Sequence, residues 1–174
     1  MAISYKVLNS VLPAIIDAKF PILIRGRHGI GKSTIVYQIA EQRGLPVVER
    51  RASQMTEGDL LGLPKVENNV TQWLAPEWLH TACNEPVVLF LDEVDRATME
   101  GRQGIFELCD SRKIAGYTLH EGTVIFACVN GGGDHGDQYQ VGEMDPAELD
   151  RYTVFDVKPT VEDWLDWADG NVSQ

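Results

Sequence analysis

The sequence predicts an α/β fold built on a parallel sheet, and three observations support this prediction. Short apolar runs suited to buried strands alternate with segments whose apolar residues recur at helical spacing. A glycine-rich loop joins the first of these strands to a helix. An Asp-Glu pair directly follows a later apolar run, at the end of a strand where ligands bind in open α/β sheets. We therefore expect one domain with a binding site at the carboxyl edge of its sheet.

The glycine-rich loop, RGRHGIGKST at residues 25–34, contains a complete match to the phosphate-binding pattern G-x-x-x-x-G-K-[ST]. Glycines permit the positive φ values and close backbone approach that let successive N–H groups point at a di- or triphosphate. Lys32 is expected to reach the β and γ phosphates from the rim of the sheet, without a role in the core, and Ser33 to bind Mg²⁺. The predicted nucleotide contacts in the loop are Gly26, Arg27, His28, Gly29, Ile30, Gly31, Lys32, Ser33 and Thr34.

The residues on either side of the loop supply the context that this motif requires. An apolar run at residues 20–24 is long enough for a buried parallel strand. Ile35, Val36, Ile39 and Ala40 then recur at helical spacing. The alternative is a glycine turn with an incidental lysine, and the agreement of pattern, strand and helix disfavours it.

A second part of the site is predicted after the apolar run at residues 87–91, where Asp92 and Glu93 follow directly. Asp92 can hold Mg²⁺ directly or through water, and Glu93 can polarise an attacking water. The alternative is that two acids open the next helix, where the helix dipole favours them. Another apolar run ends at Asn130, whose amide can orient the water or the γ-phosphate, although a polar residue that merely starts a loop is an equally good interpretation.

Further elements are predicted between these motifs. We expect a helix over residues 7–18, a strand at 46–49, a short helix at 57–61, a hairpin turning at Asn68-Asn69, a short helix at 145–151, a strand at 154–157 and an amphipathic helix at 159–168. Trp73 and Trp78 are interpreted as core residues rather than exposed contacts, because each adjoins a leucine.

Composition narrows the class of protein. The chain has 174 residues, 44% hydrophobic and 24% charged, and lacks both a signal-peptide layout and an apolar run long enough for a bilayer, so a cytoplasmic location without membrane contact is expected. A net charge of −11 disfavours nucleic acid as a partner. The three cysteines show no metal spacing and are predicted to be free thiols. Asp134, His135 and Asp137 are interpreted as part of a solvated loop rather than a metal site.

Taken in order, these motifs resemble the AAA+ ATPases, and within them the MoxR-like and dynein-related (midasin-like) group. The likeness rests on GRHGIGKS, MTEGDLLG at 55–62, VVLFLDEVDRA at 87–97, FACVN ending at Asn130, and MDPAELDRY at 144–152, and covers most of residues 20–158. It implies a three-layer α/β/α P-loop NTPase with a five-stranded parallel sheet in the order 5-1-4-3-2. By the same resemblance Lys32 and Ser33 are Walker A residues, Asp92 and Glu93 are Walker B residues, and Asn130 is sensor 1.

The resemblance also assigns Arg151 as an arginine finger that acts on a neighbouring subunit's nucleotide. Arg96 is the competing candidate for that role, and a surface ion pair with Glu148 or Asp150 is the alternative for Arg151. Residues 1–158 are expected to form the nucleotide-binding core, and residues 159–174 a linker and the start of a lid-like helix. The sequence ends at Gln174 after what resembles only the first lid helix, so the lid is expected to be largely missing.

The function implied by the resemblance is Mg²⁺-dependent ATP binding and hydrolysis by a ring-forming module, a hexamer in this family, that remodels a partner protein or works with an adaptor. ATP and ADP are the expected ligands. The alternative is a nucleotide-dependent binding module with negligible turnover alone. A nucleic-acid motor is the third interpretation, and the acidic net charge disfavours it.

Overall fold

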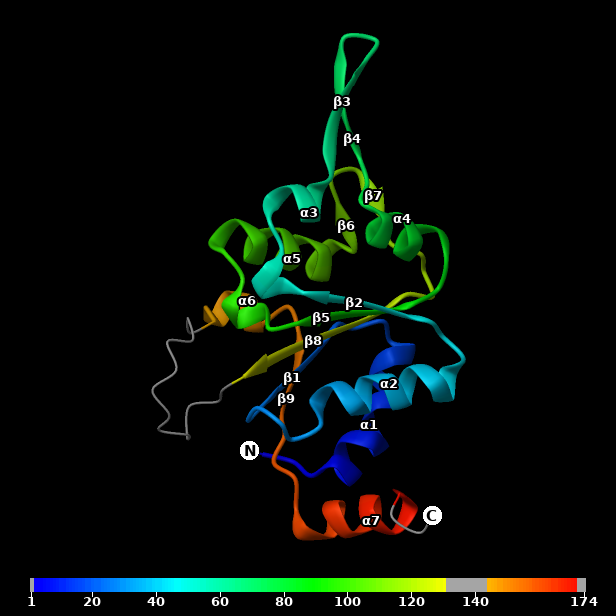
Figure 1. The fold of residues 1–174 in the computed structure, drawn as a ribbon, viewed down its shortest axis with the longest axis vertical. Coiled ribbons are helices and arrows are strands. Elements are labelled where there is room, and N and C mark those ends of the chain that lie inside the picture. The colour runs from blue at the N-terminus through cyan, green and yellow to red at the C-terminus, as the bar shows by residue number, and fades with distance from the viewer. Residues whose placement is uncertain (1, 131–143, 172–174) are drawn as a thin grey trace.

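The computed structural model describes residues 2–130 and 144–171. At its centre is a five-stranded sheet in which every neighbouring pair is parallel. Its strands are β1 (Ile22–Gly26), β2 (Val47–Arg51), β5 (Val88–Asp92), β8 (Val124–Asn130) and β9 (Thr153–Asp156). They lie in the order β2-β5-β8-β1-β9 (Figure 1). If the five strands of this sheet are renumbered 1 to 5 in chain order, their order from the β9 edge is 5-1-4-3-2, as predicted.

Helices cover both faces of the sheet, which confirms the three-layer prediction (Figure 1). On one face lie α1 (Tyr5–Asp17) and α2 (Lys32–Arg43), with α7 (Val161–Asn171) at the same end of the molecule. On the other face lie α3 (Glu57–Leu61), α4 (Glu77–Asn84) and α5 (Met99–Ser111). The short helix α6 (Pro146–Leu149) precedes β9, and the 3₁₀ turns η1 (Ala52–Gln54) and η2 (Val94–Arg96) follow β2 and β5.

The central strands are apolar along their whole length because both of their faces are buried. In β5, Leu89 and Leu91 belong to the core on the α3–α5 face, whereas Val88 and Phe90 belong to the core on the α1–α2 face. All four side chains have no exposed surface. Successive side chains of a strand point to opposite faces, so an uninterrupted apolar run fills two cores at once.

The predicted hairpin is present as β3 (Leu63–Glu67) and β4 (Val70–Leu74), and it projects from the body of the molecule (Figure 1). Asn68 and Asn69 form its turn with φ values of 52° and 61°, a conformation that asparagine tolerates better than most residues. The prediction for Trp78 is confirmed, since it is 3% exposed, but the prediction for Trp73 was wrong. Trp73 is 37% exposed because the hairpin stands away from the sheet, and both of its strands are exposed throughout.

A second two-stranded ribbon, β6 (Lys113–Ile114) and β7 (Tyr117–Thr118), lies at the base of this hairpin. The Tyr117 hydroxyl donates a hydrogen bond to the Trp73 carbonyl oxygen at 2.6 Å and accepts one from the Ala75 N–H at 3.3 Å. The Tyr117 side chain therefore attaches the backbone of the hairpin at its base, while the apolar side chains of the hairpin are exposed.

The remaining predictions are partly confirmed. The amphipathic helix is present as α7, with Val161, Trp164 and Leu165 of its apolar stripe exposed. All three cysteines are free thiols, and Cys109 and Cys128 are buried. Asp134, His135 and Asp137 lie outside the described residues. Within residues 2–130 and 144–171, no helix has both the length and the apolar character needed to cross a membrane.

Candidate nucleotide-binding site

The glycine-rich loop connects the end of β1 at Gly26 to the start of α2 at Lys32. Gly29 and Gly31 have φ values of 78° and 95°, where a side chain would be strained. Gly26 is required for a different reason, because a Cβ there would lie 2.5 Å from Cδ1 of Ile30 and 2.9 Å from the carbonyl oxygen of Val157. The loop is therefore folded closely over the end of β1, in a shape that depends on glycine at three positions.

Lys32 is held at the carboxyl edge of the sheet by three oxygen atoms. Its Nζ donates hydrogen bonds to the carbonyl oxygens of Gly26 and Arg27, both at 2.9 Å, and to Oδ1 of Asn130 at 2.8 Å. Burial lowers the pKa of Lys32, and the nearby carboxylates of Asp92 and Asp95 oppose this effect. Lys32 lies at the predicted edge of the sheet and belongs to neither apolar core cluster, but it is buried there rather than exposed at the surface. Its side chain is 7% exposed, since the loop folds over the ammonium group.

The start of α2 fits a phosphate group. The cap position, Gly31, offers no side chain to the first turn, so no side-chain cap occupies the N–H groups there. A Cβ at Gly29 would meet no atom within 4 Å, which shows that the loop borders open space. In the same region Arg27, His28 and Thr34 are exposed, and Ile30 and Ser33 are half-buried. Free N–H groups, the helix dipole and an adjacent ammonium group together form an anion-binding site.

Asp92 and Glu93 lie where β5 ends and η2 begins. Burial raises the pKa of Asp92, while the hydrogen bond that its Oδ1 accepts from the Glu93 N–H at 2.9 Å lowers it. Glu93 has a φ of 54°, an uncommon value for a residue with a side chain, and such strain is concentrated at functional sites. The hard oxygens of Ser33 and Asp92 are suitable ligands for Mg²⁺, so the residues present fit this metal.

The sequence analysis missed two residues that contact the predicted site: Ser53 contacts Glu93, and Asp95 contacts Asn130. The Ser53 hydroxyl in η1 donates a 2.5 Å hydrogen bond to Oε2 of Glu93. Asp95, 5% exposed, accepts a 3.1 Å hydrogen bond from the backbone N–H of Asn130. Burial raises the pKa of Asp95, and its Oδ1 is buried without a hydrogen-bond partner among the described atoms. Asp95 is the third acid of LDEVD and could have been suspected, but nothing in the sequence points to Ser53.

The strand that leads into the loop is also fixed by an ion pair. Nε and Nη2 of Arg25 in β1 donate to the two carboxylate oxygens of Asp156 in β9, at 2.7 and 2.9 Å. Such two-point geometry is the strongest form of the Arg–carboxylate contact. It holds the end of β1 against the edge strand one residue before the loop begins.

Arg151 makes its contacts within its own chain. Its guanidinium lies 4.1 Å from the centre of the Phe106 ring, Nη1 donates to the Ala147 carbonyl oxygen at 2.6 Å, and Nε lies 3.5 Å from Oδ1 of Asp110. The ion-pair alternative considered from the sequence named the wrong partner, because Glu148 pairs with Arg102 instead. The competing candidate, Arg96, lies 3.9 Å from Glu93 within the same chain.

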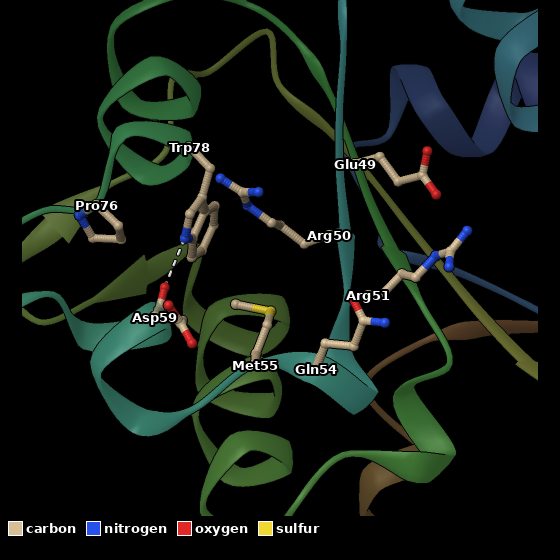
Figure 2. Close-up of a pocket in the computed structure, with 8 residues that line it drawn as sticks. All are labelled: Glu49, Arg50, Arg51, Gln54, Met55, Asp59, Pro76 and Trp78. Carbon is tan, nitrogen blue, oxygen red and sulfur yellow. Dashed lines mark hydrogen bonds between the residues drawn. The ribbon is translucent and has the colours of Figure 1, made fainter.

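A cavity of about 520 Å³ lies beside the edge strand β2 (Figure 2). It is lined by Glu49, Arg50, Arg51, Gln54, Met55, Asp59, Pro76 and Trp78. None of these residues belongs to the loop or to the acidic pair, but Arg51 pairs with Asp92 where β2 and β5 end, so the cavity adjoins the acidic edge of the site. Its Trp78 is fixed in place by a 2.8 Å hydrogen bond from Nε1 to the Asp59 carbonyl oxygen.

The fold and the site define a P-loop nucleotide-binding protein of the AAA+ class. The sequence profile of the AAA domain (dynein-related subfamily) matches residues 21–128, and the chain belongs to this family. This match includes the glycine-rich loop, the acidic pair and most of β8, and it ends two residues before Asn130.

Three relatives are similar in sequence. Midasin of Giardia intestinalis is 35% identical over 94 residues, which cover 53% of this chain and 2% of midasin. CbbQ of Hydrogenophilus thermoluteolus is 31% identical over 97 residues, covering 55% of this chain and 36% of CbbQ. BssE of Thauera aromatica, assigned as a chaperone, is 31% identical over 154 residues, covering 80% of this chain and 51% of BssE. The chain thus spans about half or less of the length of these relatives.

Solved structures support the fold. A Cytophaga hutchinsonii protein assigned as an ATPase gives a TM-score of 0.68 at 17% identity, over 99% of this chain and 52% of that protein. A point mutant of RuvB from Thermotoga maritima gives 0.66 at 13% identity, over 98% of this chain and 51% of RuvB. At these identities the likeness establishes the shared fold alone.

Proposed function

We propose that this domain binds ATP with Mg²⁺ and hydrolyses it to ADP and phosphate. The observation that carries the proposal is the position of Lys32. Its ammonium group sits between the glycine-rich loop and Asn130, beside the uncapped start of α2 and among residues from the ends of β1, β5 and β8. An ammonium group whose described hydrogen-bond partners are all oxygen atoms, in an anion-binding loop, suits the β and γ phosphates of a nucleotide.

The residues at the carboxyl edge of the sheet have different roles in hydrolysis. Lys32 and the N–H groups of the loop bind the phosphates, and Ser33 and Asp92 would hold Mg²⁺, which neutralises the charge on the phosphate oxygens when bound. Glu93 accepts a proton from the water whose oxygen forms a bond to the γ-phosphorus. The bond from that phosphorus to the bridging oxygen breaks, and ADP leaves. Asn130 orients the γ-phosphate or the water through its amide group.

A second candidate function, nucleotide-dependent binding with little turnover, is favoured by the contact between Ser53 and Glu93. A carboxylate that accepts a short hydrogen bond from a protein hydroxyl is less available to a water molecule. In this case ATP would change the conformation of the domain and its affinity for a partner, and the lone chain would hydrolyse ATP slowly.

Turnover of the Glu93→Gln variant separates the two functions. Measured by phosphate release, turnover should fall about a hundredfold or more, because the variant lacks the general base, while the Kd for mant-ATP should stay within about twofold of wild type. Glu100→Gln, an exposed acid in α5, is the matched control and should behave like wild type. If wild type and Glu93→Gln show the same low turnover and both bind mant-ATP, the domain is a nucleotide-dependent binding module.

The larger assembly belongs to the same proposal. We infer that copies of this domain form a ring, a hexamer in keeping with the family resemblance, in which Arg151 or Arg96 stabilises charge on a neighbour's nucleotide. We also infer that the ring acts on a protein partner, as the assignment of BssE as a chaperone suggests. The net charge of −11 disfavours a nucleic-acid partner.

A further inference from the structure

The phosphate loop contacts a residue far outside its motif, Tyr5 in the first turn of α1. The Tyr5 hydroxyl donates a 2.7 Å hydrogen bond to the carbonyl oxygen of Ile30. A Cβ at Gly31 would lie 3.7 Å from the same hydroxyl, so Tyr5 also lies against the next residue of the loop. Burial, followed by the neighbouring Cys128 and Asp163, raises the pKa of Tyr5 to about 12. The hydroxyl therefore keeps its proton and remains a donor at neutral pH.

The backbone of Tyr5 is bonded in turn to the C-terminal helix. Asp163 in the first turn of α7 accepts hydrogen bonds from the N–H groups of Tyr5 and Lys6, at 3.4 and 3.3 Å. The same carboxylate accepts from the N–H and the hydroxyl of Thr160, at 2.8 and 3.1 Å. One side chain thus joins the first turns of α1 and α7, which lie at the same end of the molecule (Figure 1).

The charge of Asp163 suits this position. Partial burial acts to raise the pKa of Asp163, but the hydrogen bonds from Thr160, Lys6 and Tyr5 lower the pKa below its ordinary value. The group is therefore ionised at neutral pH. A carboxylate at the start of two helices interacts favourably with both helix dipoles. The two bonds to α1 are long, so each is individually weak, whereas the bond from Tyr5 to the loop is short.

The bond to Ile30 fixes the direction of the next N–H group. In a planar trans peptide, the C=O of one residue and the N–H of the following residue point in opposite directions. When Tyr5 holds the Ile30 carbonyl on its side, the Gly31 N–H must face the other way. The orientation of a phosphate-binding N–H group is thereby determined by a residue of α1.

We propose that α7 controls the shape of the phosphate loop through Asp163 and Tyr5, so that the placement of the C-terminal helix sets the affinity for nucleotide. The proposal rests on the proposed function, since it concerns the same site. Asp163 fixes the first turn of α1, that turn fixes Tyr5, and the Tyr5 hydroxyl fixes the peptide between Ile30 and Gly31. Tyr5 and Asp163 are positioning residues, which act through the loop.

Hydrogen exchange in nucleotide-free protein tests the relay without relying on catalysis. Tyr5→Phe should speed exchange of the peptide covering residues 26–34 about fivefold, because one net hydrogen bond is lost. Asp163→Ala should speed it about two- to fivefold, and the double variant should exchange no faster than Tyr5→Phe. Glu162→Ala, an exposed neighbour on the same helix, is the control and should match wild type. Additive effects, or an unchanged loop in Asp163→Ala, would overturn the relay.

Titration with mant-ADP then connects the loop to binding. The Kd should rise by about the same factors as the exchange rates, at a temperature where a thermal melt shows every variant to be folded. Asp163→Asn, which keeps an oxygen acceptor, should recover most of the affinity. A wild-type protein that does not bind mant-ADP would refute the proposed function, and the exchange data would still decide the relay. If hydrogen exchange of the loop changes but the Kd for mant-ADP does not, the proposed link between loop shape and nucleotide affinity is overturned.

Discussion

Removing the Ser53 hydroxyl should raise the rate at which the isolated domain hydrolyses ATP. In the structure Oε2 of Glu93 accepts a 2.5 Å hydrogen bond from Ser53, and this contact must break before the same oxygen can accept a proton from water. A hydrogen bond of this kind contributes about 0.5–1.5 kcal/mol net, and more when one partner is charged. Freeing the carboxylate should therefore increase kcat by at least about 2- to 12-fold in Ser53→Ala, with little change in the Kd for ATP.

The assay is steady-state phosphate release at saturating ATP and Mg²⁺, at one fixed protein concentration. Ser53→Thr keeps the hydroxyl and should behave like wild type, and Ser53→Ala combined with Glu93→Gln should be inactive. The opposing possibility is that Ser53 holds Glu93 in its working orientation. A kcat that falls or stays unchanged in Ser53→Ala, while Ser53→Thr is normal, would refute the argument that this hydrogen bond restrains catalysis.

Four further predictions concern residues of the proposed site. Lys32→Ala should abolish mant-ATP binding. It should also lower the free energy of unfolding by about 1–3 kcal/mol in a urea titration, because it leaves buried acceptors unpaired. Retained affinity for mant-ATP would contradict the assignment of the nucleotide site. Asn130→Ala should lower kcat more than it weakens ATP binding, and an equal loss of both would make Asn130 a binding residue. Arg151→Ala should bind ATP normally but hydrolyse it poorly, and mixing it with Lys32→Ala should restore activity if Arg151 acts on a neighbouring subunit; no recovery, where wild type associates, would count against that role. Asp95→Asn should raise the midpoint of thermal unfolding at pH 7 by about 2–4 °C. A carboxyl whose pKa is raised on folding stabilises the protein below its unfolded pKa and loses that contribution as the pH rises. A lower midpoint would show that the charge of Asp95 is stabilising.

The sequence was sufficient for the parallel sheet and for the position of the glycine-rich loop. Buried parallel strands appear as uninterrupted apolar runs, and the run at residues 87–91 could be recognised in this way. The glycine pattern is equally local, because Gly29 and Gly31 are required by their own φ values. The order of the strands was predictable only through resemblance to a family, since no local pattern specifies which strands become neighbours.

The burial of individual side chains was harder to predict than secondary structure. Trp73 and Trp78 both adjoin a leucine, yet one is exposed on a projecting hairpin and the other is buried in the core on the α3–α5 face. Lys32 lies at the predicted edge of the sheet, yet it is buried there because the loop folds over it. In each case the deciding factor is how an element packs against residues distant in sequence, which periodicity within one segment does not report.

Asn130 shows why the contacts at this edge have to be considered together. Its side chain accepts a hydrogen bond from Lys32, which follows β1, and its backbone N–H donates to Asp95, which follows β5. The end of β8 is therefore bonded to the segments that follow both of its neighbouring strands. Asn130→Ala removes only the first bond and leaves the bond from the backbone N–H to Asp95 in place. The variant should consequently keep the strand ends in register while the Lys32 ammonium loses one of its three oxygen partners, which is why we expect it to affect the rate more than the fold.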